Sequence, residues 1–174
     1  MKSAIPFLIL AAMFAAGCGT DYCWRSSVPK EYRTISVPNF RNESKVMEAG
    51  VVASRQLLRE LQREGTFRIA GADDAVLEIQ GKIVSGASGV AAYNRRSMLR
   101  NIAYNFSMTA EITVVDKRRG RVLVDNRRYV GETTFTTGQD VSNAERGAAG
   151  RAADDIARQV VDDLLRMDFN KRSK

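Results

Sequence analysis

The longest regular pattern in the chain is an alternation of apolar and polar residues over residues 102–115. Apolar side chains occupy every second position from Ile102 to Val114, and polar side chains fill most of the positions between them. A period of two over this length excludes a helix and predicts a β-strand with one buried face. Residues 75–84 alternate in the same way, with Leu77 among the apolar positions, and predict a second half-buried strand.

A turn sequence follows the long alternating stretch. Residues 116–120 read Asp-Lys-Arg-Arg-Gly, in which Gly120 can adopt the positive φ of a tight turn. We therefore expect the chain to return antiparallel over residues 121–131. A shorter alternation at residues 34–38 predicts another strand, which Pro38 ends because proline cannot donate a ladder hydrogen bond.

Two stretches have the helical period of 3.6 residues. Residues 46–64 place their apolar side chains on one stripe, with Ser44 as the expected N-cap and Gly65 as the terminating residue. Residues 144–167 carry repeated apolar doublets, and their alanines should permit close approach to a sheet. Ser-Asn-Ala-Glu at residues 142–145 has the form of a capping box at the start of this second helix.

The predicted element order is strand, helix, strand, strand, strand, helix, with residues 67–69 as a brief further strand or bend. We therefore expect an α+β fold, a two-layer sandwich in which two helices pack on one face of a four-stranded mixed sheet. The first helix would be the crossover between parallel strands, and the later strands would form hairpins. Residues 85–100 and 133–140 are expected to be polar loops, and the first is long enough to suggest a functional role.

The first residues have the pattern of an export signal. Lys2 precedes an apolar run that begins at Ile5 and is too short to cross a bilayer. The run closes with Ala-Ala-Gly-Cys at residues 15–18, which resembles the lipobox of bacterial lipoproteins. The resemblance implies that residues 1–17 are a signal peptide and that Cys18 is the lipid-modified first residue of the mature chain. An ordinary secretory signal with an incidental Cys18 is the alternative.

The pattern divides the chain into four parts. These are the signal peptide at 1–17, a lipidated linker at 18–33, one α+β domain at 34–169 and a basic tail at 170–174. The domain is large enough to hold one hydrophobic core. If Cys18 carries lipid, Cys23 has no internal partner and is expected to be a spare thiol near the tether.

Composition narrows the chemistry. The chain contains no histidine, which removes the usual general base and the commonest transition-metal ligand. Its carboxylates form no recognisable catalytic pair and no glycine loop suits a phosphate, so we expect a protein that is not an enzyme and needs no cofactor or metal. The net charge of +7 indicates an anionic partner: lipid phosphate, lipopolysaccharide, peptidoglycan carboxylate or an acidic protein surface. Nucleic acid is in the wrong compartment for an exported chain.

Several short motifs resemble those of the lipopolysaccharide-assembly lipoprotein family, LptE. Residues 37–42, Val-Pro-Asn-Phe-Arg-Asn, match its apolar-Pro-x-Phe-x-Asn segment before the first helix. Residues 74–81, Asp-Ala-Val-Leu-Glu-Ile-Gln-Gly, are similar to its Ala-Asp-Ala-x-Leu-x-Gly strand. Further features occupy positions that correspond to those of the family: Pro29, Gly65, the long hairpin and the alanine-rich last helix. The resemblance therefore covers nearly all of the mature chain.

The resemblance implies a non-catalytic lipoprotein anchored at Cys18 on the periplasmic face of the outer membrane. The residue after Cys18, Gly19, also favours the outer membrane. It implies assembly with an LptD-type β-barrel and binding of lipopolysaccharide for insertion into the outer leaflet. Guanidinium groups at loop tips suit lipid A phosphates because their fork can bind two oxygens. The candidate lipopolysaccharide-binding residues are Arg95, Arg96, Lys117, Arg118, Arg119 and Arg121. For each one, a solvated basic turn is the alternative interpretation.

Two other kinds of lipoprotein have similar patterns. Outer-membrane activators of peptidoglycan synthases and curli-secretion lipoproteins also combine an apolar-Pro-x-Phe-x-Asn stretch with a helix and an Ala-Asp-x-x-Leu-x-Gly strand. The chain would then dock on a synthase or form a secretion ring. The sequence has no obvious membrane-inserting hairpin, which argues against a secretion ring. A linker over residues 18–33 reaches only about 50 Å at roughly 3.3 Å per residue, which is short for a synthase activator.

Overall fold

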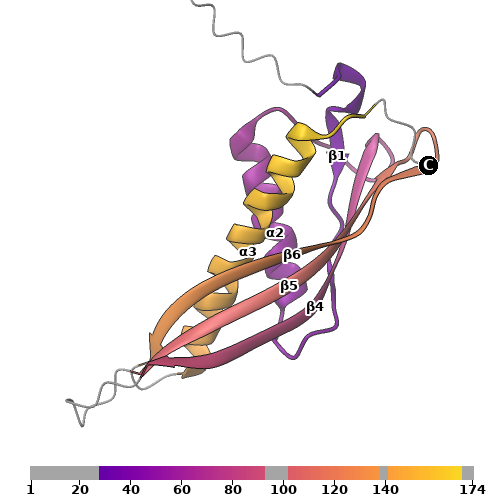
Figure 1. Cartoon of the computed structure of the whole chain (residues 1–174). Coiled ribbons are helices and arrows are strands. Elements are labelled where there is room, and N and C mark those ends of the chain that lie inside the picture. Colours follow the sequence, from indigo (N-terminus) through magenta and orange to yellow (C-terminus); the bar gives the residue numbers. More distant parts are fainter. Residues whose placement is uncertain (1–27, 93–101, 138–140, 170–174) are drawn as a thin grey trace, which may run out of the picture.

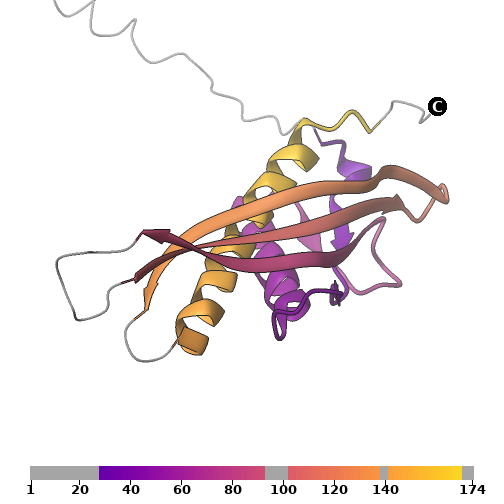
Figure 2. The same cartoon turned by 60° about the horizontal axis from the view of Figure 1, so that its bottom comes forward.

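A computed structural model describes residues 28–92, 102–137 and 141–169 and shows one sheet with both long helices on the same face (Figures 1 and 2). The elements are a 3-10 helix η1 (Lys30–Tyr32), the strands β1 (Thr34–Ser36), β2 (Arg41–Asn42), β3 (Arg68–Ile69), β4 (Leu77–Ala92), β5 (Ile102–Asp116) and β6 (Arg121–Thr137), and the helices α2 (Ala49–Glu64) and α3 (Val141–Arg166). The predicted α+β fold of two layers is confirmed.

The sheet has six strands rather than the predicted four. Its order is β3-β1-β4-β5-β6, and β2 also pairs with β4. β1 is parallel to β3 and β4, whereas β4, β5 and β6 are antiparallel, so the predicted mixed sheet is confirmed. The two extra strands, β2 and β3, have two residues each, which is too short for an alternation to show in the sequence.

β4 and β6 are longer than their patterns indicate. β4 continues to Ala92 and β6 to Thr137, so the polar loops predicted over residues 85–100 and 133–140 are wrong for residues 85–92 and 133–137. Residues 85–92 are mostly serine, glycine and alanine, which give no apolar alternation although their backbone pairs with β5. The threonines after residue 132 favour a strand because their branched side chains fit a pleated surface.

The core lies between the sheet and the two helices. Its strand residues come from the alternating positions, including Leu77, Ile79 and Phe106, which are fully buried. Leu57 of α2 and Val160 of α3 close the other side. The alternation therefore identifies the buried face correctly, as expected where every second side chain points to the same side.

The apolar-Pro-x-Phe-x-Asn motif works as a packing device. Phe40 is buried, and a Cβ on Gly81 would lie 2.7 Å from its ring. A Cβ on Gly50 would lie 2.2 Å from the Phe40 carbonyl oxygen. Because any larger residue would collide at these positions, two glycines from β4 and α2 create the notch that holds Phe40.

Helix starts differ from the prediction, whereas the predicted end of α2 is confirmed. Gly65 ends α2 with φ of +78° and donates its amide to the Leu61 carbonyl, as expected. Ser44 is not the N-cap, because α2 starts at Ala49 and the Ser44 hydroxyl donates to Asn42 Oδ1 over 2.7 Å. The capping box at residues 142–145 is also wrong, because α3 already begins at Val141.

α3 approaches the sheet closely at Gly131 of β6. A Cβ on this glycine would lie 2.0 Å from the carbonyl oxygen of Ala152. Ala148, Ala152 and Ala153 are all buried on the helix face toward the core. Small residues on both elements thus bring helix backbone and strand backbone together, as the alanine pattern indicates.

The folded domain starts before the predicted boundary at residue 34. Val28 and Tyr32, which the sequence places in the linker, are buried and belong to the core. The described segment that starts at Val28 is therefore part of the domain. In the described parts of the chain, no helix combines the length and apolar character that a membrane span requires.

Candidate functional site

The β5–β6 turn carries the largest group of predicted binding residues that the structure describes. Residues 117–120 form the turn, and Gly120 has φ of +60°. Asp116 organises it, because its Oδ1 accepts hydrogen bonds from the amides of Arg118 and Arg119, both over 3.1 Å. An aspartate that binds the amides two and three residues further on stabilises a turn locally.

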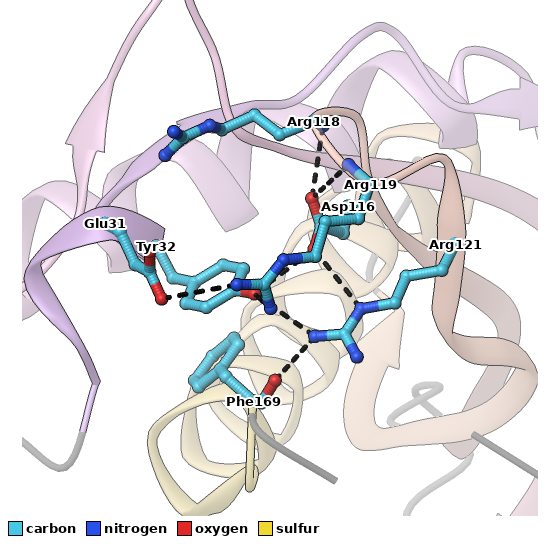
Figure 3. Close-up of polar contacts among 7 residues, drawn as sticks. All are labelled: Glu31, Tyr32, Asp116, Arg118, Arg119, Arg121 and Phe169. Atoms are coloured by element: carbon cyan, nitrogen blue, oxygen red, sulfur yellow. Dashed lines mark hydrogen bonds and ion pairs between the residues drawn. The ribbon is translucent and has the colours of Figure 1, made fainter. Parts of the chain in front are cut away.

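Arg121 is the innermost cation of this group (Figure 3). Its Nε donates to Asp116 Oδ2 over 3.3 Å, and its terminal NH2 donates to the Tyr32 hydroxyl over 3.1 Å and to the Phe169 carbonyl over 2.6 Å. The Asp116 side chain is fully buried and that of Arg121 is 21% exposed. Arg121 therefore joins the hairpin to the N-terminal segment and to the residues after α3, which limits its availability to a ligand.

Arg119 is bound more loosely at the same place. Its NH1 donates to the Tyr32 hydroxyl over 2.5 Å, and its NH2 lies 3.9 Å from Glu31 Oε1. Its guanidinium carbon lies 5.6 Å from the Tyr32 ring centroid, within the range of a cation–π contact. Half of the side chain remains exposed, so it can also face an external anion.

Lys117 lies on the other side of the turn. Its ammonium group donates to the Ala72 carbonyl and lies 3.5 Å from Glu78 Oε2. About a third of its side chain is exposed. An exposed ion pair of this kind contributes little to stability, and the ammonium group can exchange it for a stronger anion.

Arg118 differs from its three basic neighbours. Only its backbone amide enters the network, and within the described part of the chain its guanidinium has no hydrogen bond or ion pair. Figure 3 shows the side chain extending away from the cluster around Tyr32. Arg118 is therefore an exposed cation on a backbone that Asp116 holds in place.

The predicted candidates do not all gather at this site. Arg95, Arg96, Cys18 and Cys23 lie outside the described residues. The described part of β4 ends where Ala92 pairs with Ala103, while the turn follows Asp116 at the other end of β5. These two ends of the strand are about 44 Å apart at roughly 3.4 Å per residue.

Sequence reasoning missed the residues that hold the turn. Tyr32 falls in the predicted linker and Phe169 has no sequence signal, yet their rings stack with centroids 4.9 Å apart. Asp116 belongs to the predicted turn, and its role there follows from the sequence, because an aspartate before a short polar loop that contains glycine is a turn signal. The role of Tyr32 does not, since its hydroxyl contacts Asp116 across 84 positions of the chain.

A second charged cluster lies across three strands on the sheet face that the helices leave open. Glu111 accepts from Lys82 over 2.7 Å and from Arg128 over 2.9 Å. The Lys82 and Arg128 hydrogen bonds lower the pKa of Glu111, and the bond to Glu111 raises the pKa of Lys82. Glu111 is thus shared by two cations from the neighbouring strands, and the cluster stabilises strand pairing.

Solved structures with similar folds include a lipoprotein and a protein of the family DUF330. A minor lipoprotein from Acinetobacter baumannii is 14% identical, with a TM-score of 0.50 over 78% of this chain and 94% of that chain. A Xanthomonas campestris protein of the family DUF330 is 9% identical, with a TM-score of 0.51 over 79% and 88% of the two chains. At these identities the similarity concerns the fold alone.

Comparison with protein families gives a more specific result. No curated protein matches the sequence significantly. The family model described as LptE, lipopolysaccharide-assembly, matches residues 32–164, which include the hairpin turn, all of α2 and all but the end of α3. This family is a non-enzymatic component of lipopolysaccharide assembly. The chain belongs to the lipopolysaccharide-assembly family LptE.

Proposed function

We propose that this chain is an outer-membrane lipoprotein, anchored by lipid on Cys18, that binds lipopolysaccharide through its β5–β6 turn. We further propose that it does so in assembly with an LptD-type β-barrel, to which it contributes a lipid-binding surface. Membership in the lipopolysaccharide-assembly family supports the general role. The β5–β6 turn supports the specific role, lipopolysaccharide binding, because it places cations on a backbone that hydrogen bonds from Asp116 hold fixed.

The observation that carries the proposal is the exposed guanidinium of Arg118, which has no partner among the described residues and stands on a turn that Asp116 holds fixed. A phosphate suits this group because two parallel N–H donors can reach two phosphate oxygens. Lys117 and Arg119 stand on either side and keep partial exposure. Because the backbone of the turn is ordered before binding, little backbone conformational entropy is lost when the phosphate arrives.

Arg121 has a different part in this proposal. Its hydrogen bonds to Asp116, Tyr32 and Phe169 occupy its guanidinium inside the protein. It supports the turn and is not expected to contact lipid directly. Arg95 and Arg96 remain candidates for a separate basic group.

The position of the turn relative to the proposed anchor supports the same function. Ten peptide units separate Cys18 from Val28, so the linker spans at most about 36 Å. The described chain starts beside the turn, because Arg33 donates to the Val28 carbonyl and Tyr32 contacts Asp116. A chain anchored at Cys18 would therefore hold the turn within reach of the membrane surface, where anionic lipid headgroups lie.

The lipid half of the proposal is tested with the full lipidated chain in detergent. We expect lipopolysaccharide and lipid A with both phosphates to bind, and lipid A stripped of phosphate to bind at least tenfold more weakly. Equal binding of all three lipids would contradict the phosphate mechanism.

A pull-down from solubilised membranes tests the barrel: copurification of a large outer-membrane β-barrel is expected, and recovery of the chain without one would contradict the proposed assembly with a barrel.

A further inference from the structure

The outer edge of β4 is exposed beyond the point where β2 ends. β2 pairs with β4 at Lys82 and Ile83, and Glu43 extends this pairing when its amide donates to the Ile83 carbonyl over 2.9 Å. From residue 85 to residue 91, no described residue forms a backbone hydrogen bond on this side of β4. β4 lies on the outer side of the three long strands, next to β5 and away from β6 (Figure 1).

The opposite edge of the sheet, at β6, is protected. Gln159 of α3 donates to the Val130 carbonyl over 2.9 Å, and Arg151 donates to the Thr134 carbonyl over 3.4 Å. β6 also carries exposed charges at Arg128 and Glu132. Helix cover and charge are the usual means by which a protein prevents an edge strand from pairing with another chain.

Over residues 85–91, no helix residue in the described part of the chain donates a hydrogen bond to the backbone of β4. Residues 85–91 read Ser-Gly-Ala-Ser-Gly-Val-Ala, without a charge or a proline, and Val90 is 48% exposed. Edges without such residues accept an added strand readily. The difference between β4 and β6 therefore points to a pairing function for β4 rather than to a general feature of this sheet.

A groove runs beside this edge on the helix side. It has a volume of about 570 Å³, and its floor is the β4 backbone at Gly86, Ala87 and Ser88. One wall contains Val46 and Met47 from the segment before α2, and the other contains Ser142, Glu145 and Arg146 from the first turns of α3. A strand edge next to a helix terminus is the arrangement in which an extended peptide can bind through both backbone and side chains.

The lining indicates which peptide would fit. Met47 is 77% exposed and offers an apolar contact. Lys45 and Arg146 are exposed cations, whereas the single acidic residue of the lining, Glu145, accepts a hydrogen bond from the Ser88 hydroxyl over 2.7 Å. Two cations against one carboxylate leave the lining with one net positive charge, and an acidic side chain next to an apolar one complements it.

We propose that residues 85–91 of β4 and the adjacent groove bind an extended acidic segment of a partner protein as an additional strand. β2 already occupies the same edge position for two residues, and the partner segment would continue that line. Its backbone would pair with β4, its apolar side chain would contact Met47, and its carboxylate would face Lys45 and Arg146. This inference does not depend on lipid binding by the β5–β6 turn.

The test uses the full chain, labelled with ¹⁵N, in detergent and a synthetic peptide, acetyl-Thr-Glu-Val-Thr-Glu-Val-Thr-amide. We expect shifts in the amide signals of residues 85–91 and of Met47 and Arg146. The same peptide methylated at alternate amide nitrogens should bind at least tenfold more weakly, because it cannot pair with the edge. The affinity of a peptide with lysine in place of glutamate should be at least fivefold lower.

Two protein variants complete the test. Arg146→Glu should weaken binding of the acidic peptide at least fivefold, whereas Arg55→Glu, an equal charge change at an exposed position of α2, should not. Shifts confined to β6 or to the turn at residues 117–120 would overturn the proposal, as would equal binding of the methylated peptide. Concentration-dependent shifts at residues 85–91 without peptide would also overturn it, since the edge would then bind a second copy.

Discussion

The hydroxyl of Tyr32 donates a hydrogen bond to the buried carboxylate of Asp116 over 3.2 Å, although 84 positions separate the two residues. The same oxygen accepts hydrogen bonds from Arg119 and Arg121. One hydroxyl thus links the N-terminal segment to the basic turn. This contact connects the fold to the proposed function, because it holds the turn next to the start of the folded domain.

Replacing Tyr32 by phenylalanine should lower the free energy of unfolding by about 2 kcal/mol. The ring would still stack on Phe169, but Asp116 and two arginines would lose a shared partner. Chemical denaturation measures the effect. Tyr104→Phe is the matched control, because Tyr104 stacks on Phe135 and its hydroxyl has no hydrogen bond in the described part of the chain. Equal losses in both variants would show that the hydroxyl network contributes nothing.

Gly131→Ala should disrupt the contact between β6 and α3. The added methyl group would lie 2.0 Å from the Ala152 carbonyl oxygen, and neither backbone can move without repacking the core. A loss of about 3 kcal/mol is expected, at the upper end of typical overpacking costs. Gly89→Ala adds the same methyl group where no atom lies within 4 Å and should change stability little. Thermal unfolding of the two variants compares them, and similar melting temperatures would refute the close-approach argument.

Stability should fall in acid partly through Glu111. Hydrogen bonds from Lys82 and Arg128 lower its pKa in the folded state below the ordinary value of 4.5. The unfolded chain therefore binds a proton first as the pH falls, and the stabilisation present above pH 4.5 is lost as the pH drops through the folded-state pKa. Glu111→Gln should lose less stability than the wild type between pH 7 and pH 3.

Urea denaturation at the two pH values measures this difference. Glu132→Gln, an exposed glutamate on the neighbouring strand β6, is the control and should keep the acid dependence of the wild type. If Glu111→Gln and wild type lost the same free energy of unfolding between pH 7 and pH 3, the cluster of Lys82, Glu111 and Arg128 would have no part in acid sensitivity.

Periodic apolar residues made most of the fold predictable. β4 and β5 are recognisable because every second side chain along them is apolar and points to the core, as Leu77, Ile79 and Phe106 do. Residues 85–92 could not be recognised as strand, since small side chains leave no alternation even where the backbone pairs with β5. The strands β2 and β3 are visible only through their partners in the sheet.

The candidate site was predictable in position but not in organisation. The run Lys117, Arg118 and Arg119 before Gly120 identifies a basic turn from sequence alone. Arg121 is bound inside because Tyr32 and Phe169 accept its hydrogen bonds, and these two residues reach the turn only after the chain has folded. Contacts between segments so distant in sequence leave no local pattern to detect.

The most direct test of the central claim is the affinity of the full lipidated chain for lipopolysaccharide after removal of the Arg118 charge. Arg118→Gln should bind five- to tenfold more weakly, about the loss of one charge-assisted hydrogen-bond pair, with unchanged unfolding behaviour. Arg55→Gln removes an equal charge from the surface of α2 and should bind like the wild type. Equal affinity of Arg118→Gln and Arg55→Gln would contradict the assignment of the β5–β6 turn as the lipopolysaccharide-binding site.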